Sequence, residues 1–271
     1  MRNRVHLRAA LLSAVSALAL AAAPVMAQEG VDETDETTAA VPLKPLIVTA
    51  SPIASPIDEL AAPVDIVTRD EILSSSATTL GGLLGDLPGV SQSSFAAGAS
   101  RPIIRGLDNT RVRMQENGIG AADVSAVSED HGVPIDPLSA ERVEVVRGPA
   151  TLRYGSEAIG GVVNVINNRI PKAIPAGGFS AEAGASYDSV SDGVQAHGQA
   201  DAAAGNVVFH IDSFARNTDN YRVPGTPDRQ SETWTETSGI AGGASIILGN
   251  GEYDGYAGGS ISYYDSKYGI P

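Results

Sequence analysis

Small and apolar residues alternate with polar ones along several stretches of the chain after residue 178. The alternation is clearest in residues 179–187, 194–202 and 207–212, and it is weaker in residues 256–264. A period of two residues predicts β-strands with one apolar and one polar face. Strands of about ten residues with small outward-facing side chains are typical of a transmembrane β-barrel. A soluble antiparallel sandwich alternates in the same way, so this pattern alone leaves both architectures open.

The N-terminus has the parts of a secretory signal peptide. Three arginines among the first eight residues precede an apolar run from Leu11 to Ala23, and Val25-Met26-Ala27 fits a small-residue cleavage site. We therefore expect residues 1–27 to be removed on export. Residues 28–45 are acidic and rich in threonine and proline, which predicts a disordered arm.

Composition narrows the class of protein. The net charge of −14 opposes a nucleic-acid binder, because phosphate binding needs a basic face. The chain has no cysteine, which agrees with export and excludes disulfides and thiolate metal sites. Ser156-Glu157 lacks a nearby histidine and the surrounding glycines do not form a nucleophile elbow, so we do not expect an enzyme.

Residues 51–171 predict a compact α+β domain. The run Thr68-Arg69-Asp70-Glu71 has the form of a capping box that opens a short helix. The segment Gly161–Asn167 is almost entirely apolar, which predicts a strand buried on both faces. An apolar stripe of a second helix, expected to end at Pro88-Gly89, consists of Leu80, Leu83, Leu84 and Leu87. Further strands are expected at residues 64–67, 101–105, 111–114 and 142–146. A tight turn at Asn117-Gly118 is expected to follow the third of these. Asp136 is expected to cap a helical turn that starts at Pro137.

A short β-prone segment precedes this domain. Leu46-Ile47-Val48-Thr49-Ala50 lies between prolines, which bar it from a central strand. An extended peptide near a chain terminus can add to the sheet edge of another protein. On local evidence alone, an ordinary linker or edge strand is the favoured interpretation of this segment.

An ordered series of motifs resembles the plug domain of TonB-dependent outer-membrane receptors. Residues 46–50 look like the TonB box, and residues 64–90 look like the first plug strand, its helices and a Leu-Pro-Gly-Val motif. Ile104-Arg105-Gly106-Leu107 resembles the central Ile-Arg-Gly motif. Residues 141–149 and 160–166 resemble the closing signature of the plug. The resemblance implies an α+β plug domain followed by the first strands of an antiparallel transmembrane β-barrel.

The resemblance to plug domains also implies a function. It implies a TonB-dependent receptor of the Gram-negative outer membrane for active uptake, in which TonB and its inner-membrane energising complex pair with residues 46–50. We expect the plug at residues 51–171 and an incomplete set of barrel strands at residues 176–271, so the chain is expected to be truncated. Outer-membrane lipid is the other expected partner, and a monomer is expected. A secreted soluble binding domain is the alternative from another class.

A narrower likeness concerns the ligand. The segments around Asp123–Ser125, Ser128–His131, Val133–Leu138 and Asn217–Tyr221 resemble zinc-uptake receptors of the ZnuD type. That likeness implies Asp130 and His131 as zinc ligands, with Glu129 as a substitute oxygen donor. Carboxylate oxygens and imidazole nitrogens are both suitable ligands for Zn²⁺. We expect no prosthetic group and a zinc or other divalent ion as transported ligand. A siderophore, haem or cobalamin receptor is the alternative within the same fold.

Charged residues of the plug motifs suggest a second role. Arg105 and Arg147, with Glu141 and Glu144, are candidates for polar contacts between plug and barrel that would loosen under pull at the TonB box. Simple surface charges on strands are the alternative. Two histidines, His197 and His210, fall on the polar phase of their strands, so we expect them on the inner wall and not as metal ligands.

Overall fold

The computed structural model describes residues 46–47, 55–56, 63–121, 124–225, 228–249 and 255–271. The predictions of a signal peptide at residues 1–27, an arm at residues 28–45 and the last three residues of the TonB box lie outside these residues. Within the part of the chain that is described, no helix is long and apolar enough to cross a membrane.

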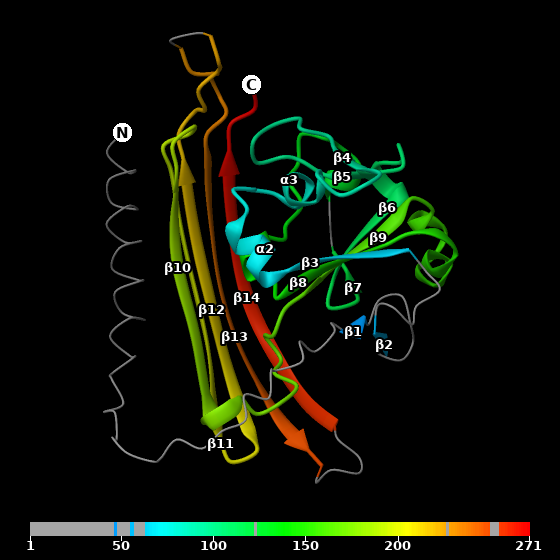
Figure 1. Ribbon diagram of the computed structural model, residues 1–271, viewed down its shortest axis with the longest axis vertical. Helices are drawn as coiled ribbons and strands as arrows, with labels where there is room; N and C mark the ends of the chain where they lie inside the picture. The colour runs from blue at the N-terminus through cyan, green and yellow to red at the C-terminus, as the bar shows by residue number, and fades with distance from the viewer. Residues whose placement is uncertain (1–45, 48–54, 57–62, 122–123, 226–227, 250–254) are drawn as a thin grey trace, which may run out of the picture.

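Two bodies make up the fold, an α+β domain and a long antiparallel sheet that follows it (Figure 1). The α+β domain contains β3 (Val64–Thr68), α2 (Arg69–Ser74), α3 (Leu80–Leu84), β4 (Val90–Gln92), β5 (Pro102–Ile104), β6 (Val112–Glu116), β7 (Ile119–Gly120), β8 (Arg142–Val146) and β9 (Gly161–Ile166). The C-terminal sheet contains β10 (Phe179–Asp188), β11 (Gly193–Ala204), β12 (Val207–Thr218), β13 (Thr235–Leu248) and β14 (Gly255–Tyr268). A small pair, β1 (Leu46–Ile47) and β2 (Ser55–Pro56), precedes them.

The central sheet of the α+β domain has the strand order β3-β8-β9-β6-β7. Strands β6 and β9 are parallel, and the other neighbours are antiparallel. The strand predicted at residues 142–146 is β8, and the one predicted from Gly161 is β9, whose six residues are all buried. Full burial of β9 follows from its place in the middle of the sheet, because both of its faces are covered.

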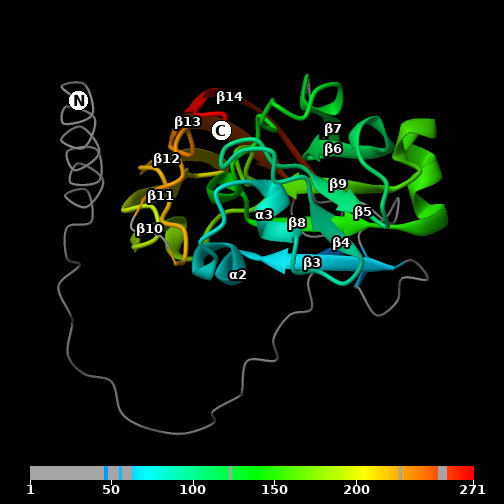
Figure 2. The same ribbon diagram turned by 90° about the horizontal axis from the view of Figure 1, so that it is seen from above.

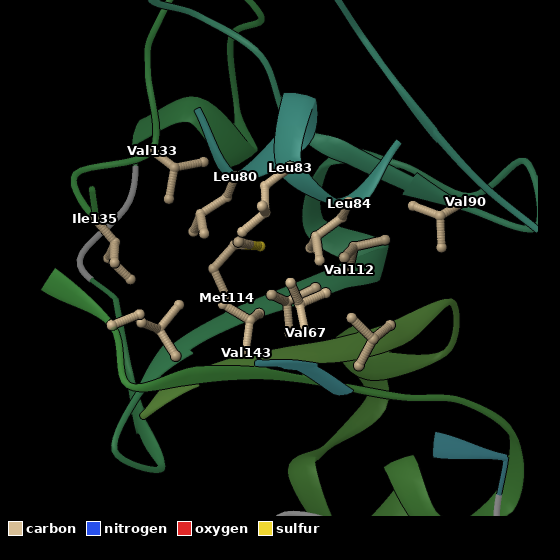
Figure 3. Close-up of a cluster of buried hydrophobic side chains, with 14 of the residues drawn as sticks. Val67, Leu80, Leu83, Leu84, Val90, Val112, Met114, Val133, Ile135 and Val143 are labelled. Atoms are coloured by element: carbon tan, nitrogen blue, oxygen red, sulfur yellow. The ribbon is translucent and has the colours of Figure 1, made fainter. Parts of the chain in front are cut away.

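The hydrophobic core lies between one face of this sheet and helices α2 and α3 (Figure 3). Leu80, Leu83 and Leu84 of α3 point toward Met114 of β6 and Val143 of β8. A smaller cluster covers the opposite face and contains Val146, Ala158 and Val162, with Val64, Ala150 and Tyr154 packed against it. Burial of these apolar side chains is the main force that holds the domain together.

The capping box predicted at Thr68 is present. The hydroxyl of Thr68 accepts a hydrogen bond from the Glu71 amide, and the Glu71 carboxylate accepts from the Thr68 amide at 2.7 Å. The second helix, α3, starts at Leu80 after its N-cap Thr79 and ends at Leu84, so the prediction that it reaches Pro88-Gly89 was wrong. Glycines 81, 82 and 85 weaken the helix, and Leu87 reaches the core from the following turn.

A pH dependence follows from the capping box. Hydrogen bonds from the amide and hydroxyl of Thr68 hold the pKa of Glu71 below its usual range. The pKa is lower in the folded state, so Glu71 stabilises α2 at neutral pH, and this stabilisation is lost as the pH falls through the folded-state pKa. We expect hydrogen-exchange protection in residues 68–74 to drop between about pH 5 and pH 3.

The Glu71→Gln variant tests the cause of that drop. Glutamine can also serve in a capping box but does not titrate, so its protection should show no step over the same range. The neighbouring variant Asp70→Asn should keep the step of the wild type. A step that persists in Glu71→Gln would assign the effect to another group.

Two turns depend on left-handed backbone conformations. Asn117 and Gly118 have φ values of 49° and 82°, which fits the two-residue hairpin turn predicted between β6 and β7. Arg105 and Gly106 have φ values of 52° and 76°. The strand predicted at residues 101–105 is therefore wrong at its ends: β5 stops at Ile104, because a left-handed residue cannot continue a strand.

The C-terminal sheet is antiparallel throughout, in the order β10-β11-β12-β13-β14. Its strands have 10 to 14 residues, so they match or exceed the predicted length of about ten residues. Their register puts one residue phase on an inner face toward the α+β domain and the other on an outer face. Seen from above, the sheet curves around one side of the domain (Figure 2).

The outer face of the C-terminal sheet is apolar and exposed. Phe209 is 52% exposed, Ile261 81% and Tyr263 64%, and all three lie on the outer phase. A band of exposed apolar side chains on a sheet is unfavourable in water and marks a surface that contacts lipid or another apolar partner. The predicted alternation of an apolar and a polar face is thus confirmed in this sheet.

The two ends of the sheet differ. One end, called the loop end here, carries the β10–β11 turn, the long β12–β13 connection and the end of β14 at Tyr268, and it lies uppermost in Figure 1. The other end, the turn end, carries the short β11–β12 turn at residues 205–206. The tip of the β4–β5 hairpin of the α+β domain lies toward the loop end.

Candidate functional site

Ion pairs join the α+β domain to the inner face of the C-terminal sheet. The most buried is between Arg216 of β12 and Asp136, whose side chains are 2% and 1% exposed. The guanidinium makes two contacts with the carboxylate, at 2.6 and 3.3 Å, and also donates to the carbonyl of Thr78 at 3.0 Å. Asp136 caps the helical turn at Pro137–Ser139 as predicted, so the same carboxylate orders its own loop and binds the sheet.

A second pair lies near helix α2. Arg69 binds Glu182 of β10 at 2.6 Å and donates to the carbonyls of Leu138 and Ala140 at 2.8 Å. His197 of β11 lies 3.4 Å from the same Glu182 carboxylate. The guanidinium therefore links the sheet to two segments of the α+β domain at once.

A third polar cluster lies at the C-terminal end of the α+β domain. Arg169 binds Asp212 of β12 at 3.0 Å and Glu116 of β6 at 2.8 Å. His210 lies between two carboxylates, with Nδ1 2.8 Å from Asp201 and Nε2 3.3 Å from Asp212. A doubly protonated imidazole can donate to both of them. His197 and His210 thus lie on the inner face, as predicted.

The four predicted gating residues lie in different surroundings. Glu141 contacts the sheet, because Gln199 of β11 donates to its carboxylate at 3.1 Å. Glu144 is fully buried inside the α+β domain and pairs with Arg142 at 2.9 Å. Arg147 binds Asp65 and the carbonyl of Pro88, also within the domain. Arg105 is exposed on its turn.

The gating residues predicted from the plug motifs therefore account for few of the contacts that join the domain to the sheet. Arg69, Asp136 and Arg169 make them from the α+β domain. A usable signal was present in the strands: Glu182, Asp212 and Arg216 stand on the inward phase, where a charge needs a partner. The sequence gives no indication of which residue that partner is.

The predicted metal ligands lie in an exposed turn of the α+β domain. The amide of His131 donates to the carbonyl of Ser128 at 3.3 Å, so Asp130 and His131 share a turn, as two ligands of one ion require. The Ser128 hydroxyl donates to Asp130 and holds the pKa of this carboxyl below its usual range. His131 and Glu129 are exposed. Among the residues that the structure describes, no group of three or more His, Asp or Glu side chains could hold a metal ion.

A cavity of about 360 Å³ opens at the loop end between the domain and the sheet. Its lining combines hydroxyl groups with the aromatic side chains of Phe95 and Tyr221, which are 42% and 38% exposed. Residues 94–97 of the β4–β5 hairpin form one wall, and Tyr221 and Thr233 of the β12–β13 connection contribute another. This cavity is a candidate ligand-binding surface that the sequence did not indicate.

The β12–β13 connection is ordered by contacts across the loop end. Asp192 in the β10–β11 turn accepts hydrogen bonds from Arg222, from Arg229 and from the Tyr187 hydroxyl. Arg222 and Arg229 also form an isolated β-bridge within the connection. The connection is therefore held beside the cavity by charge-assisted hydrogen bonds.

The first two residues of the predicted TonB box are paired with their own chain. Leu46 lies opposite Pro56 and Ile47 opposite Ser55 in a short antiparallel pair. Val48, Thr49 and Ala50 lie outside the described residues.

Comparisons with known proteins agree with this architecture. Residues 56–162 match the family described as TonB-dependent Receptor Plug Domain. The chain is similar to the vitamin B12 transporter BtuB of Photobacterium profundum, with 28% identity over 261 residues, which is 94% of this chain and 41% of that protein. The chain thus spans less than half the length of this relative.

Solved structures share the fold. The unliganded ferric citrate transporter FecA matches with a TM-score of 0.60 and 20% identity, over 79% of this chain and 32% of that chain. A mutant of the ferric enterobactin receptor PfeA from Pseudomonas aeruginosa matches with a TM-score of 0.55 and 19% identity, over 76% of this chain and 34% of that chain. The α+β domain therefore has the fold of the plug domain of TonB-dependent receptors, and the antiparallel strands that follow it are arranged as in these solved structures.

Proposed function

We propose that this chain is the N-terminal part of an outer-membrane receptor that takes up a cobalamin or a ferric chelate and is energised by TonB. The observation that carries the proposal is the similarity to a vitamin B12 transporter along 94% of the chain, covering both the plug and the strands. The exposed apolar outer face of the C-terminal sheet supports a place in the membrane. The receptor is proposed to act as a monomer.

The proposed domain organisation completes this picture. Residues 1–27 direct export to the Gram-negative envelope, and residues 28–45 are the acidic arm that precedes the box. Residues 46–50 present the TonB box, residues 51–171 form the plug, and residues 176–271 contribute barrel strands. Outer-membrane lipid contacts the apolar face, and TonB with its energising complex contacts the box from the periplasm.

Free zinc is the second candidate ligand. The observation in its favour is that Asp130 and His131 share one exposed turn at the loop end. Two side chains do not complete a zinc site, so this ion would need further ligands. A chelated metal needs no such protein ligands, and a cavity with hydroxyl and aromatic groups suits it better.

A binding assay on the full-length receptor separates these ligands. Purified receptor is titrated with cyanocobalamin, ferric citrate, ferric enterobactin and zinc chloride. We expect saturable binding of cyanocobalamin or of a ferric chelate, and weak binding of zinc that is lost in the Asp130→Ala, His131→Ala double variant. The Asp265→Ala variant is the control for loss of charge. Binding of zinc alone, sensitive to the double variant, would replace the proposed ligand; binding of none would refute the proposal.

Deletion of residues 46–50 tests the dependence on TonB. Without the box no strand can be added to TonB, so uptake of the bound ligand should fall to the level of cells that lack the receptor. Ligand binding should stay unchanged, because the described walls of the cavity come from the plug and the C-terminal sheet. The measurement compares uptake of radiolabelled ligand with surface binding in the same cells. Uptake that persists would remove residues 46–50 from the mechanism.

A further inference from the structure

Tyr268, the last residue of β14, makes two hydrogen bonds to one loop of the plug. Its hydroxyl accepts from the amide of Gly132 at 2.8 Å and donates to the carbonyl of Asp130 at 3.0 Å. The partners are more than 130 residues apart in the sequence. Both bonds go to the backbone, so they fix the path of the loop that carries Asp130 and His131.

The ring of Tyr268 also packs against a second plug segment. A Cβ atom on Gly98 would lie 2.5 Å from Cγ of Tyr268, and a Cβ on Gly132 would lie 2.5 Å from the carbonyl oxygen of Gly98. Neither glycine has a positive φ, so the close approach and not the backbone conformation excludes a side chain there. Three segments therefore meet at one point: the strand β14, the tip of the β4–β5 hairpin and the 128–132 loop.

One of the two plug segments held at this point borders the candidate ligand surface. Gly98 lies in the tight tip that is closed by the Ala96–Ala99 bridge, and residues 94–97 next to it line the 360 Å³ cavity. The other segment, the 128–132 loop, carries the exposed His131. A displacement of Tyr268 would move both segments together.

We propose that Tyr268 is a positioning residue for ligand binding: it fixes the β4–β5 tip and the 128–132 loop against the wall strand β14. The proposal rests on the proposed function, because it assigns the cavity to the transported ligand. A ligand that contacts either plug segment is thereby coupled to the loop end of β14. Tyr268 itself need not contact the ligand.

The Tyr268→Phe variant of the full-length receptor tests the geometry without a ligand. It removes one hydroxyl and keeps the ring. The amide of Gly132 loses its acceptor, so its hydrogen exchange should become about three- to tenfold faster. The Tyr263→Phe variant, on the outer face of the same strand, should leave this exchange unchanged. Equal exchange at Gly132 in wild type and Tyr268→Phe would overturn the proposal.

Ligand affinity tests the functional part. We use whichever of cyanocobalamin, ferric citrate and ferric enterobactin the wild type binds, and expect Tyr268→Phe to bind it about three- to tenfold more weakly. Tyr263→Phe should bind like the wild type. Equal affinity of Tyr268→Phe and wild type overturns the role of Tyr268 while the receptor function stands. A wild type that binds none of the probes refutes the proposed function instead.

A second variant, Gly98→Ala, changes the plug side of the contact between Gly98 and Tyr268. The methyl group of Gly98→Ala would lie 2.5 Å from Cγ of Tyr268, which is too close for an undisturbed contact. This variant should weaken binding of the same probe at least as much as Tyr268→Phe. Gly259→Ala, in the same wall strand with open space around its Cβ position, is the control. In the Gly98→Ala, Tyr268→Phe double variant the two effects should not add, because both disturb one contact. Additive losses would contradict the shared contact.

Discussion

Replacing Asp136 by alanine should destabilise the protein by about 3–5 kcal/mol, because it leaves the guanidinium of Arg216 buried without its counter-ion. Both side chains are almost fully inaccessible, so without the carboxylate the guanidinium would keep only its neutral acceptors, the Gln195 side chain and the carbonyl of Thr78. The same change removes the cap of the Pro137–Ser139 turn. The measurement is the free energy of unfolding from a denaturant titration of the purified protein.

Two variants make this expectation specific. Asp265→Ala removes a carboxylate of a surface pair with Lys267, 3.4 Å apart and 40% exposed, and should cost well under about 1 kcal/mol. In the Asp136→Leu, Arg216→Met double variant both charges disappear, so much of the lost stability should return. A loss in Asp136→Ala no larger than that in Asp265→Ala would show that the Asp136–Arg216 pair is not buried in the protein.

The second large effect is expected at Gly243 of strand β13. A Cβ atom there would lie 1.8 Å from the carbonyl oxygen of Arg169, so the backbone that leaves the plug rests directly on this glycine. Gly243→Val should therefore displace the segment that carries Arg169 and weaken its ion pair with Asp212. We expect a loss of about 1–3 kcal/mol or more, measured in the same denaturant titration.

The neighbouring glycine provides the matched control. Gly242 lies on the outer phase, and the nearest atom to its Cβ position is the carbonyl oxygen of His210 at 3.8 Å. Gly242→Ala should leave stability within about 0.5 kcal/mol of the wild type. Equal effects of Gly243→Val and Gly242→Ala would contradict the contact between Arg169 and β13.

Local elements of the fold could be predicted where the interactions are local. The capping box at Thr68, the Asn117-Gly118 turn and the buried strand β9 each depend on residues close in sequence or on an uninterrupted apolar run. The end of helix α3 could not be predicted from its leucines, since Leu87 serves the core equally well from a turn. Apolar spacing reports burial, and burial does not require that the helix continue.

The candidate site was predictable to a smaller extent. The likeness to zinc-uptake receptors pointed to Asp130 and His131, and the structure places them in one turn. The cavity lined by Phe95 and Tyr221 was not, because its walls come from segments more than 100 residues apart. Motif residues such as Glu144 and Arg147 proved to have partners inside the plug, whereas Arg69 and Asp136 bind the sheet.

By itself, the sequence determined the alternating strands, the two-sided burial of β9 and the polar inner phase of the C-terminal sheet. These features depend on the two-residue period of a strand and on the number of apolar residues available for burial. Only the tertiary structure decided which inward charge meets which plug residue, and that Tyr268 meets Gly98 and Gly132. Such pairings join residues far apart in the chain, and their geometry exists only once the plug lies against the sheet.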